Sequence, residues 1–87
     1  MIRVSVPSQL RDYVAGAKEV PAEGATLGAV FDDLDRRFPG LRFRVIDEQG
    51  RVRRHMVVFV DGEREEDLSR PLRSDAEVFV IGALSGG

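Results

Sequence analysis

The sequence of 87 residues lacks cysteine entirely and contains a single histidine, His55. Without cysteine the chain can form no disulfide, and it offers neither a thiolate nucleophile nor the usual ligands of structural zinc. With one histidine, a histidine-rich metal site or a catalytic triad is hard to build on this chain alone. These two absences argue against most enzymes, so we expect a protein with no catalytic residues of its own, no bound cofactor and no metal.

Lysine is almost as rare, because Lys18 is the only one. It lies outside any glycine-rich loop, and the phosphate-binding P-loop pattern does not occur in the sequence. We therefore do not expect the chain to bind and activate ATP by itself. Any activation with ATP has to be carried out by a partner.

Long apolar runs are missing as well. No segment approaches the ~18 consecutive apolar residues of a membrane span, and the N-terminus lacks the apolar core of a secretory signal peptide. The net charge of −2 gives no general attraction to nucleic acid or anionic lipid. We expect a cytoplasmic protein, monomeric when free, that binds neither nucleic acid nor membranes.

The composition, with 43% hydrophobic and 32% charged residues, is that of one small globular domain. Alternation of apolar and polar residues over 2–6 predicts a half-buried strand that ends at Pro7. A connection with a few buried residues follows over 8–16, and 18–20 predicts a short strand that ends at Pro21. The first part of the chain thus predicts two strands.

The clearest element is an amphipathic helix that begins after Thr26. The hydroxyl of Thr26 suits an N-cap, because it can accept a hydrogen bond from a backbone N–H one turn into the helix. Pro39 and Gly40 end the helix, since proline disfavours the helical state of the residue before it. The apolar residues spaced along one helix face are Leu27, Val30, Phe31, Leu34 and Phe38.

Beyond the helix the sequence has the patterns of strands and turns. Alternation over 41–45 predicts a short strand or a turn, and 47–50 has the composition of a turn. Segment 56–60 is rich in β-branched residues and predicts a strand. The tight-turn pair Asp61-Gly62 that follows predicts a hairpin to a short strand over 63–65.

The last predicted strand is the continuous apolar run 78–81, which is typical of a central strand covered on both faces or nearly so. The order strand, strand, helix, strand, short strand, strand predicts an α+β fold. In it, one main helix packs on one face of a mixed sheet of four to five strands. If the free face of that sheet is partly apolar, we expect it to be the docking surface for a partner.

The remaining charged residues have ordinary interpretations. His55 is expected at the surface, and the acidic cluster is expected to be solvated, because its spacing is not that of an EF-hand calcium loop. A basic run could contact phosphates, but its thin aromatic content and the negative net charge favour a solvated or protein-docking face. The acidic cluster comprises Glu63, Glu65, Glu66 and Asp67, and the basic run comprises Arg42, Arg44, Arg51, Arg53 and Arg54.

Several short motifs occur in an order that belongs together. They are Thr26-Leu27-Gly28, Leu34, Phe38-Pro39-Gly40-Leu41, Val58-Phe59-Val60-Asp61-Gly62-Glu63, Pro71-Leu72 before Asp75, and the terminal Gly86-Gly87. With the order of elements, they resemble the β-grasp, or ubiquitin-like, sulfur carriers of the MoaD/ThiS family over nearly the whole chain. Many small subunits of molybdopterin synthase carry proline after the last strand, where this chain has Gly82-Ala83-Leu84-Ser85. The resemblance is therefore nearest to the CysO-type carriers.

The resemblance implies a β-grasp domain over 1–81 and a flexible, extended diglycine tail over 82–87. In this family a partner similar to ubiquitin-activating enzymes, an adenylyltransferase and sulfurtransferase, uses ATP to join the C-terminal carboxylate to AMP. Sulfur then displaces AMP and leaves a thiocarboxylate. The six tail residues, fully extended at ~3.3 Å each, reach about 20 Å. The resemblance assigns the thiocarboxylate to Gly87, threading through a narrow channel to Gly86, and the reach of the tail to Ala83, Leu84 and Ser85.

The resemblance further implies a sulfur-accepting synthase of the cysteine, molybdopterin, thiazole or a secondary-metabolite pathway, and a protease that trims the C-terminus. Two alternatives stay open. One is a ubiquitin-like modifier whose Gly87 forms isopeptide bonds with lysines of other proteins; with Lys18 as its single lysine, chains of this protein on itself are disfavoured. The other is a β-grasp interaction module whose tail is inert.

Overall fold

Residues 1–82 are described by the computed structural model. In chain order the elements are β1 (Ile2–Ser5), the 3-10 helix η1 (Ser8–Val14), β2 (Glu19–Ala22), α1 (Leu27–Arg37), α2 (Leu41–Val45), β3 (Met56–Val60), β4 (Glu63–Arg64) and β5 (Glu77–Gly82). All five strands and the main helix lie where the sequence predicts them, within one to two residues.

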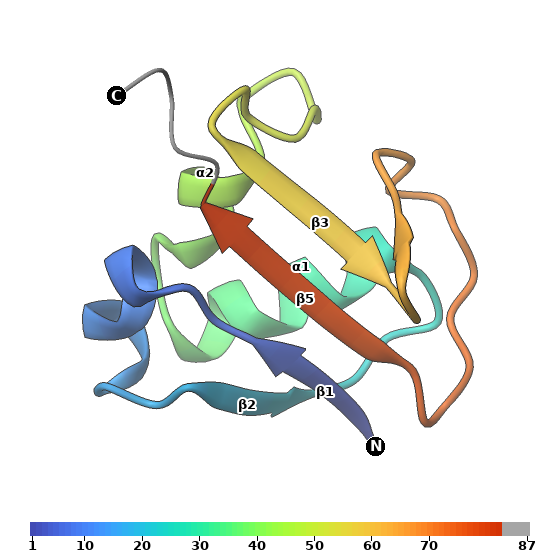
Figure 1. The fold of residues 1–87 in the computed structure, drawn as a ribbon, viewed down its shortest axis with the longest axis horizontal. Helices are drawn as coiled ribbons and strands as arrows, with labels where there is room; N and C mark the ends of the chain where they lie inside the picture. Colours follow the sequence, from blue (N-terminus) through green and yellow to red (C-terminus); the bar gives the residue numbers. More distant parts are fainter. Residues whose placement is uncertain (83–87) are drawn as a thin grey trace.

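The five strands form one mixed sheet in the order β2-β1-β5-β3-β4 (Figure 1). β1 and β5 pair parallel in the middle, and the other neighbours pair antiparallel. A parallel pair needs a long crossover connection, and here the chain passes through the helices behind the sheet and then through the β3–β4 hairpin. The predicted α+β fold, with one main helix on a mixed sheet, is confirmed.

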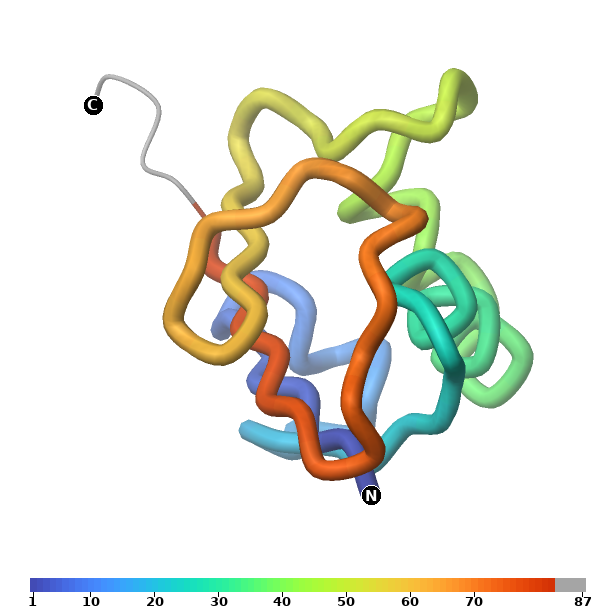
Figure 2. The backbone as a smooth tube through the Cα atoms, turned by 90° about the vertical axis from the view of Figure 1, so that its right-hand side faces the viewer, coloured from blue at the N-terminus to red at the C-terminus, as the bar shows by residue number. Residues whose placement is uncertain are grey.

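The sheet and the helices make two layers with the apolar core between them (Figures 1 and 2). Segment 65–76, orange in Figure 2, runs past the start of α1 and closes the side of the molecule before β5 begins. α1 buries Leu27, Val30, Phe31 and Leu34, as their spacing predicts. Every helix within residues 1–82 is too short or too polar to traverse a lipid bilayer.

The N-terminus of α1 explains the short motif Thr26-Leu27-Gly28. Thr26 Oγ1 accepts a hydrogen bond from the N–H of Ala29 (3.2 Å), so the predicted N-cap is confirmed. The N–H of Gly28, which has no partner inside the helix, donates to the carbonyl of Leu68 (2.8 Å). A Cβ at position 28 would lie 3.2 Å from that carbonyl oxygen, so glycine permits the close approach of segment 65–76.

The β3–β4 hairpin turns at Asp61 and Gly62, whose φ angles are +49° and +87°. Two successive positive φ angles are those of a type I′ turn, which matches the twist of a hairpin. β4 ends at Arg64, one residue before the end of the predicted strand 63–65. The carboxylate of Asp61 also accepts a hydrogen bond from the N–H of Glu77 (2.9 Å), which ties the turn to the start of β5.

Segment 41–45, predicted as a short strand or turn, is the one-turn helix α2. Leu41 and Val45 are buried and lie four residues apart on one helix face, whereas Phe43 between them is 54% exposed. The alternation that suggested a strand was therefore accidental. Asp35 Oδ1 accepts hydrogen bonds from the N–H groups of Gly40 (3.1 Å) and Arg42 (3.2 Å), which fixes the chain at the start of α2.

The expectation that 78–81 is covered on both faces is wrong, although β5 is the central strand. Val78 and Val80 are buried, but Phe79 and Ile81 are 41% and 45% exposed. Both helices lie on one side of the sheet, so the alternate residues of β5 face solvent (Figure 1). An apolar run in the sequence thus hides a strand with one free face.

Two smaller differences lie in the first third of the chain. The predicted connection 8–16 contains η1, which buries Leu10 and Val14. β2 continues through Pro21 to Ala22. β2 is an edge strand, where a proline without an N–H group can be accommodated.

Candidate functional site

The predicted site residues Ala83, Leu84, Ser85, Gly86 and Gly87 lie outside the described residues 1–82, so their roles stay predictions. The structure does describe the point from which they continue. Gly82, placed by the sequence at the start of the tail, is the last residue of β5 and lies opposite Met56, the first residue of β3. We call Gly82 the tail root. Its pairing with Met56 holds it in the sheet.

The side chain of Gln9, on η1, lies directly against the tail root. A Cβ built on Gly82 would overlap the side-chain amide of Gln9. Glycine at position 82 therefore leaves room for Gln9 to cover the end of β5 on the helix side of the sheet. No pattern in the sequence indicates this contact, because Gln9 and Gly82 are far apart in the chain and neither position is distinctive.

The free face of the sheet is apolar near the tail root. On this face Phe79 lies opposite Phe59, and Ile81 lies opposite Val57. The two β5 residues are exposed and the two β3 residues are half-buried. Directly opposed side chains on one face of a sheet are neighbours, so these four residues, the free-face patch, form one apolar surface. Such surfaces mark interaction sites.

The opposite end of the same face is charged. Arg3 on β1 lies between Glu77 on β5 (Nη2 to Oε2, 3.6 Å) and Glu19 on β2 (Nη1 to Oε1, 4.0 Å). Exposed pairs of this kind contribute at most about 1 kcal/mol to stability. The free face thus changes from polar at the start of β5 to apolar at its end, where the tail root is.

The acidic cluster has a structural role in segment 65–76. Glu65 Oε2 accepts hydrogen bonds from the N–H groups of Glu66 (3.1 Å) and Asp67 (3.0 Å), and Arg70 Nη1 donates to Glu65 Oε1 (3.1 Å). The backbone bond from Asp67, followed by the bond from Arg70, holds the pKa of Glu65 below its usual value. Arg70 Nη2 also lies 3.0 Å from Glu63 Oε1. These carboxylates stabilise a loop.

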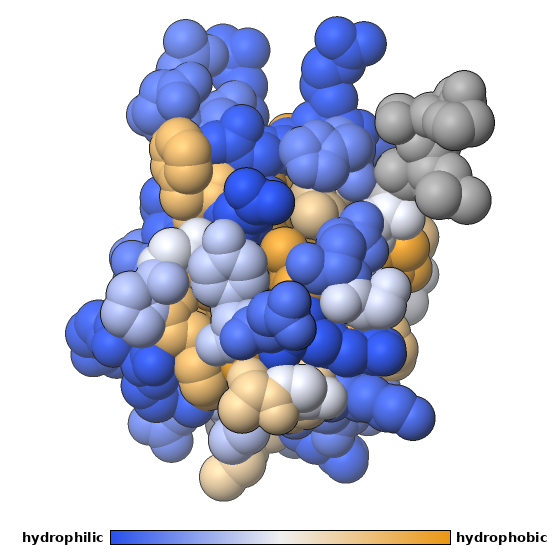
Figure 3. Space-filling view, turned by 90° about the vertical axis from the view of Figure 1, so that its left-hand side faces the viewer, coloured by the Kyte–Doolittle hydropathy of each residue, from blue (hydrophilic) through white to orange (hydrophobic). Residues whose placement is uncertain are grey.

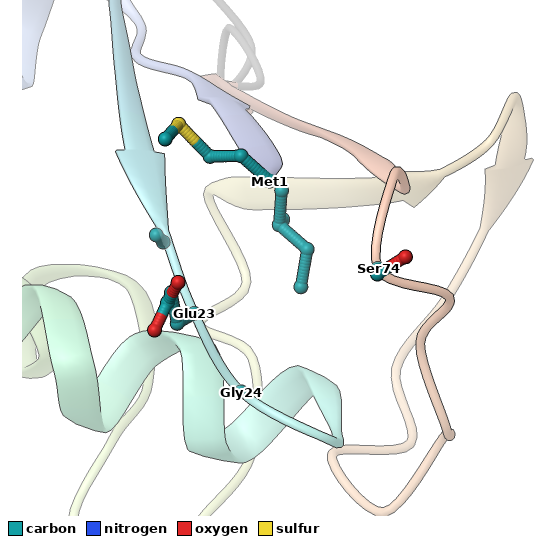
Figure 4. Close-up of a pocket in the computed structure, with 6 residues that line it drawn as sticks. Met1, Glu23, Gly24 and Ser74 are labelled. Atoms are coloured by element: carbon teal, nitrogen blue, oxygen red, sulfur yellow. The ribbon is translucent and has the colours of Figure 1, made fainter.

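The hollows of the surface offer no catalytic constellation within residues 1–82. One hollow of about 280 Å³ lies at the N-terminal end of the sheet, away from the tail root (Figure 4). Figure 4 shows the hydroxyl of Ser74 directed away from the carboxylate of Glu23, so the two do not form a nucleophile and base. Within residues 1–82, no three His, Asp or Glu side chains lie close enough together to bind a metal ion.

Sequence comparison matches the ThiS family over residues 4–87. The sulfur carrier protein CysO of Mycobacterium tuberculosis is 32% identical over 91 residues, which cover 99% of this chain and 98% of that protein. This relative is a small carrier protein, so the expectation of a carrier in place of an enzyme is confirmed.

Solved structures agree with the sequence comparison. The crystal structure of Mycobacterium tuberculosis CysO has a TM-score of 0.90 at 30% identity, covering 97% of this chain and 100% of that one. A chain of the Amycolatopsis orientalis BexX/CysO complex has a TM-score of 0.91 at 29% identity, with both chains covered completely. The H. volcanii small archaeal modifier protein 1 has a TM-score of 0.74 at 26% identity, covering 95% of this chain and 97% of that one.

These structures confirm the predicted β-grasp fold, and the CysO relatives confirm the predicted nearness to CysO-type carriers. The family match covers residues 4–87, so it runs from within β1 through all the later strands and helices to β5 and also includes the terminal Gly86-Gly87. Since both the family match and the relatives run essentially from end to end, this chain belongs to the ThiS family.

Proposed function

We propose that this protein carries sulfur as a thiocarboxylate on the main-chain carboxyl group of Gly87. The observation that carries the proposal is the Gly86-Gly87 terminus, five residues beyond the end of β5, in a chain that matches sulfur carriers along its whole length. The proposal also agrees with the absence of cysteine, because the sulfur is held by the tail and needs no side-chain thiol.

The chemistry requires activation, because a free carboxylate is a poor electrophile. A partner binds ATP, and an oxygen of the Gly87 carboxylate attacks the α-phosphorus and expels pyrophosphate. Sulfide sulfur then attacks the carbonyl carbon of the acyl adenylate and expels AMP, so that one carboxyl oxygen leaves on AMP and sulfur takes its place. This chain supplies the carboxylate and its delivery, and the partner supplies ATP binding and the reaction site.

The free-face patch supports docking beside the tail. Phe79 and Ile81 are exposed near the end of β5, three residues and one residue before the tail root. A partner that covers this apolar surface would hold the strand from which the tail continues. We propose that the adenylating partner binds here, because burying exposed apolar residues that are grouped on one face lowers the free energy of the complex.

A sulfur-accepting synthase is the second proposed partner, and the similarity to CysO favours the cysteine pathway among those the sequence left open. The structure of the Amycolatopsis orientalis BexX/CysO complex shows that a protein of this fold forms a complex with another protein. A protease that trims the C-terminus completes the proposed set of partners. The protein is proposed to act in the cytoplasm as a free monomer between these encounters.

The proposal is tested by intact-mass spectrometry after incubation with ATP, a sulfide source and the adenylating partner. The expected result is a mass gain equal to the replacement of one oxygen by one sulfur. Deletion of Gly87 should abolish the gain and leave the thermal unfolding curve unchanged, because the deletion lies beyond β5. The proposal would be overturned if the adenylating partner is active on another sulfur carrier in the same assay and this protein still gains no mass.

A second candidate is a protein modifier joined through Gly87 to lysines of other proteins. The likeness to a small archaeal modifier protein supports it. Both candidates share the adenylate, and they differ in the nucleophile that displaces AMP. Immunoblots of cells for higher-mass adducts that survive thiol treatment separate the two, because isopeptide bonds resist thiols and thioesters do not.

A further inference from the structure

The segment from α2 to the start of β3 carries arginines that have no carboxylate oxygen within 4.0 Å. Of the twelve arginines, all of which lie within residues 1–82, seven have a carboxylate oxygen within 4.0 Å. Four of the other five are Arg44, Arg51, Arg53 and Arg54. Five arginines and two acids give residues 42–54 a net charge of +3, in a chain whose net charge is −2.

The two acids of this segment, Asp47 and Glu48, form no ion pair within 4.0 Å with any arginine of residues 1–82. Asp47 Oδ1 accepts hydrogen bonds from the N–H groups of Gln49 and Arg51, both 2.9 Å, so it closes the turn. The backbone bond from Arg51 is the main reason that the pKa of Asp47 lies below its usual value, and the charges of Arg53 and Arg51 lower it further. Glu48 is exposed and pairs with no base within 4.0 Å in the described chain. We define the arginine cluster as Arg44, Arg53 and Arg54, because the first two line one hollow of the surface and Arg54 adjoins Arg53 in the chain.

Two members of the arginine cluster are held in place by aromatic rings. The guanidinium carbon of Arg53 lies 4.4 Å from the ring centre of Phe43, and Arg53 Nε donates a hydrogen bond to the carbonyl of Phe43 (2.7 Å). The guanidinium carbon of Arg44 lies 6.0 Å from the ring centre of Tyr13. Charges that are already positioned lose less side-chain freedom when a ligand binds.

The cluster borders a hollow that is open to solvent. Phe43, Arg44, Arg53 and His55 line a depression of about 290 Å³, and Arg54 beside it is exposed. In Figure 3 the upper end of the molecule, where the loop after α2 lies in Figure 1, is covered by strongly hydrophilic side chains. A cationic hollow of this kind suits carboxylates, because a guanidinium donates two parallel hydrogen bonds to one carboxylate.

The backbone joins the cluster to the tail root. Arg53 accepts a hydrogen bond at its carbonyl from the N–H of Met56 (2.9 Å), and its own N–H donates to the carbonyl of Val45 (2.9 Å). Met56 lies opposite Gly82 in the sheet. The arginine cluster thus lies at the end of the sheet from which the tail continues, separate from the residues of the free-face patch.

We propose that the arginine cluster receives an acidic surface, rich in Asp or Glu, on the partner that adenylates the tail. The inference rests on the proposed function, because that partner is defined by its use of the tail. Opposite charges beside the tail root attract and orient the partner before the tail enters it, which raises the association rate. Protein carboxylates fit better than RNA, since binding of single strands needs several free aromatic faces, and here Arg53 covers the ring of Phe43.

The test measures association of the full-length protein with the purified adenylating partner, without ATP, by surface plasmon resonance at 50 and 500 mM salt. Arg44→Glu with Arg54→Glu should slow association at 50 mM salt by roughly tenfold or more and remove most of its salt dependence. The matched control is Arg36→Glu with Arg73→Glu, two exposed arginines on α1 and in segment 65–76, outside both the arginine cluster and the free-face patch. Both double variants change the net charge from −2 to −6, so a general charge effect would slow both equally.

Equal association rates for the two variants would overturn the inference. So would loss of binding to a labelled single-stranded RNA in the cluster variant while association with the partner is unchanged. Circular dichroism shows whether each double variant is folded. If Arg44→Glu with Arg54→Glu is unfolded, Arg44→Gln with Arg54→Gln takes its place. This neutral variant should slow association with the partner by about threefold. Association is read without chemistry. A wild-type protein that binds with salt dependence but gains no sulfur therefore contradicts the proposed function and leaves the docking inference standing.

Discussion

β5 presents two faces with opposite tasks. Val78 and Val80 point toward the helices and are 0% and 5% exposed, whereas Phe79 and Ile81 alternate with them on the free face and are about half exposed. All four are apolar, so composition does not distinguish them. The difference is that α1 and α2 cover one side of the sheet only. Hydrophobic residues on the covered face stabilise the domain, and those on the free face are available to a partner.

The largest expected effect comes from placing a charge on the covered face. Val78→Asp buries a carboxylate among apolar residues without a partner, which costs about 4 kcal/mol or more. A small domain has a total stability of roughly 5–15 kcal/mol, so we expect Val78→Asp to be largely unfolded at 37 °C. Thermal unfolding followed by circular dichroism measures this, and a midpoint within a few degrees of wild type would contradict the division between the faces.

The same substitution one residue later should affect recognition and spare the fold. Phe79→Asp faces solvent, so its stability should change by less than about 1 kcal/mol. Charging the free-face patch should raise the KM of the adenylating partner for this protein by roughly tenfold or more. Arg3→Gln, on the charged end of the same face, is the control and should leave KM nearly unchanged. Equal KM values for Phe79→Asp and wild type would remove the patch from the docking surface.

A smaller effect is expected at the tail root, where the two faces meet the tail. Gly82→Ala forces the amide of Gln9 aside and should cost roughly 1 kcal/mol. In the background Gln9→Ala the same change should be neutral or stabilising, because alanine restricts the unfolded chain more than glycine does. Urea unfolding of the four proteins gives the coupling between the two positions. Additive effects would show that Gln9 does not constrain position 82.

The smallest expected effect concerns the loops around the covered face, and it appears as a dependence on pH. Asp33 accepts a hydrogen bond from the N–H of Glu23 (3.1 Å), which is the main reason that its pKa is lowered, and Arg37 and Arg36 lower it further. A lowered folded pKa means that the stabilisation is complete above the unfolded value of 3.8. It is lost as the pH falls through the lower folded value.

Asp33→Asn should therefore reduce the free energy of unfolding at pH 7 and flatten its decline below about pH 4. Urea unfolding between pH 7 and pH 2.5 measures the difference from wild type. Asp12→Asn, at an exposed aspartate of η1, serves as the matched control and should follow the wild-type curve. A variant curve for Asp33→Asn that parallels wild type over the whole range would contradict the assigned role of Asp33.

Much of the fold follows from local patterns. Thr26 and the stripe from Leu27 to Leu34 predict α1, and Asp61-Gly62 predicts the hairpin, because capping and turn chemistry act between residues close in the chain. Segment 41–45 was misassigned for the opposite reason. Its apolar residues alternate like those of a strand, and the helix α2 depends on Asp35, which binds the N–H groups of Gly40 and Arg42 from the end of α1.

The candidate site divides in the same way. The diglycine terminus is visible in the sequence. The free face was expected as a docking surface, but its residues could not be named, because 78–81 contains no polar residue that would reveal which side is open. The contact of Gln9 with Gly82, and the position of the arginine cluster beside Gly82 through the pairing of Met56, join parts of the chain that no local rule connects. Their positions follow from strand pairing and helix packing.

The sequence by itself predicted a carrier in place of an enzyme, because it has no cysteine, one histidine and one lysine, and because its motifs, with Gly86-Gly87, resemble those of sulfur carriers. It also determined the main elements, since their signals are local. Only the tertiary structure decided which residues of β5 are free for a partner and which charges accompany the tail root. The physical reason is that burial and ion pairing depend on which segments lie against each other, and β1, β3 and β5 meet only after folding.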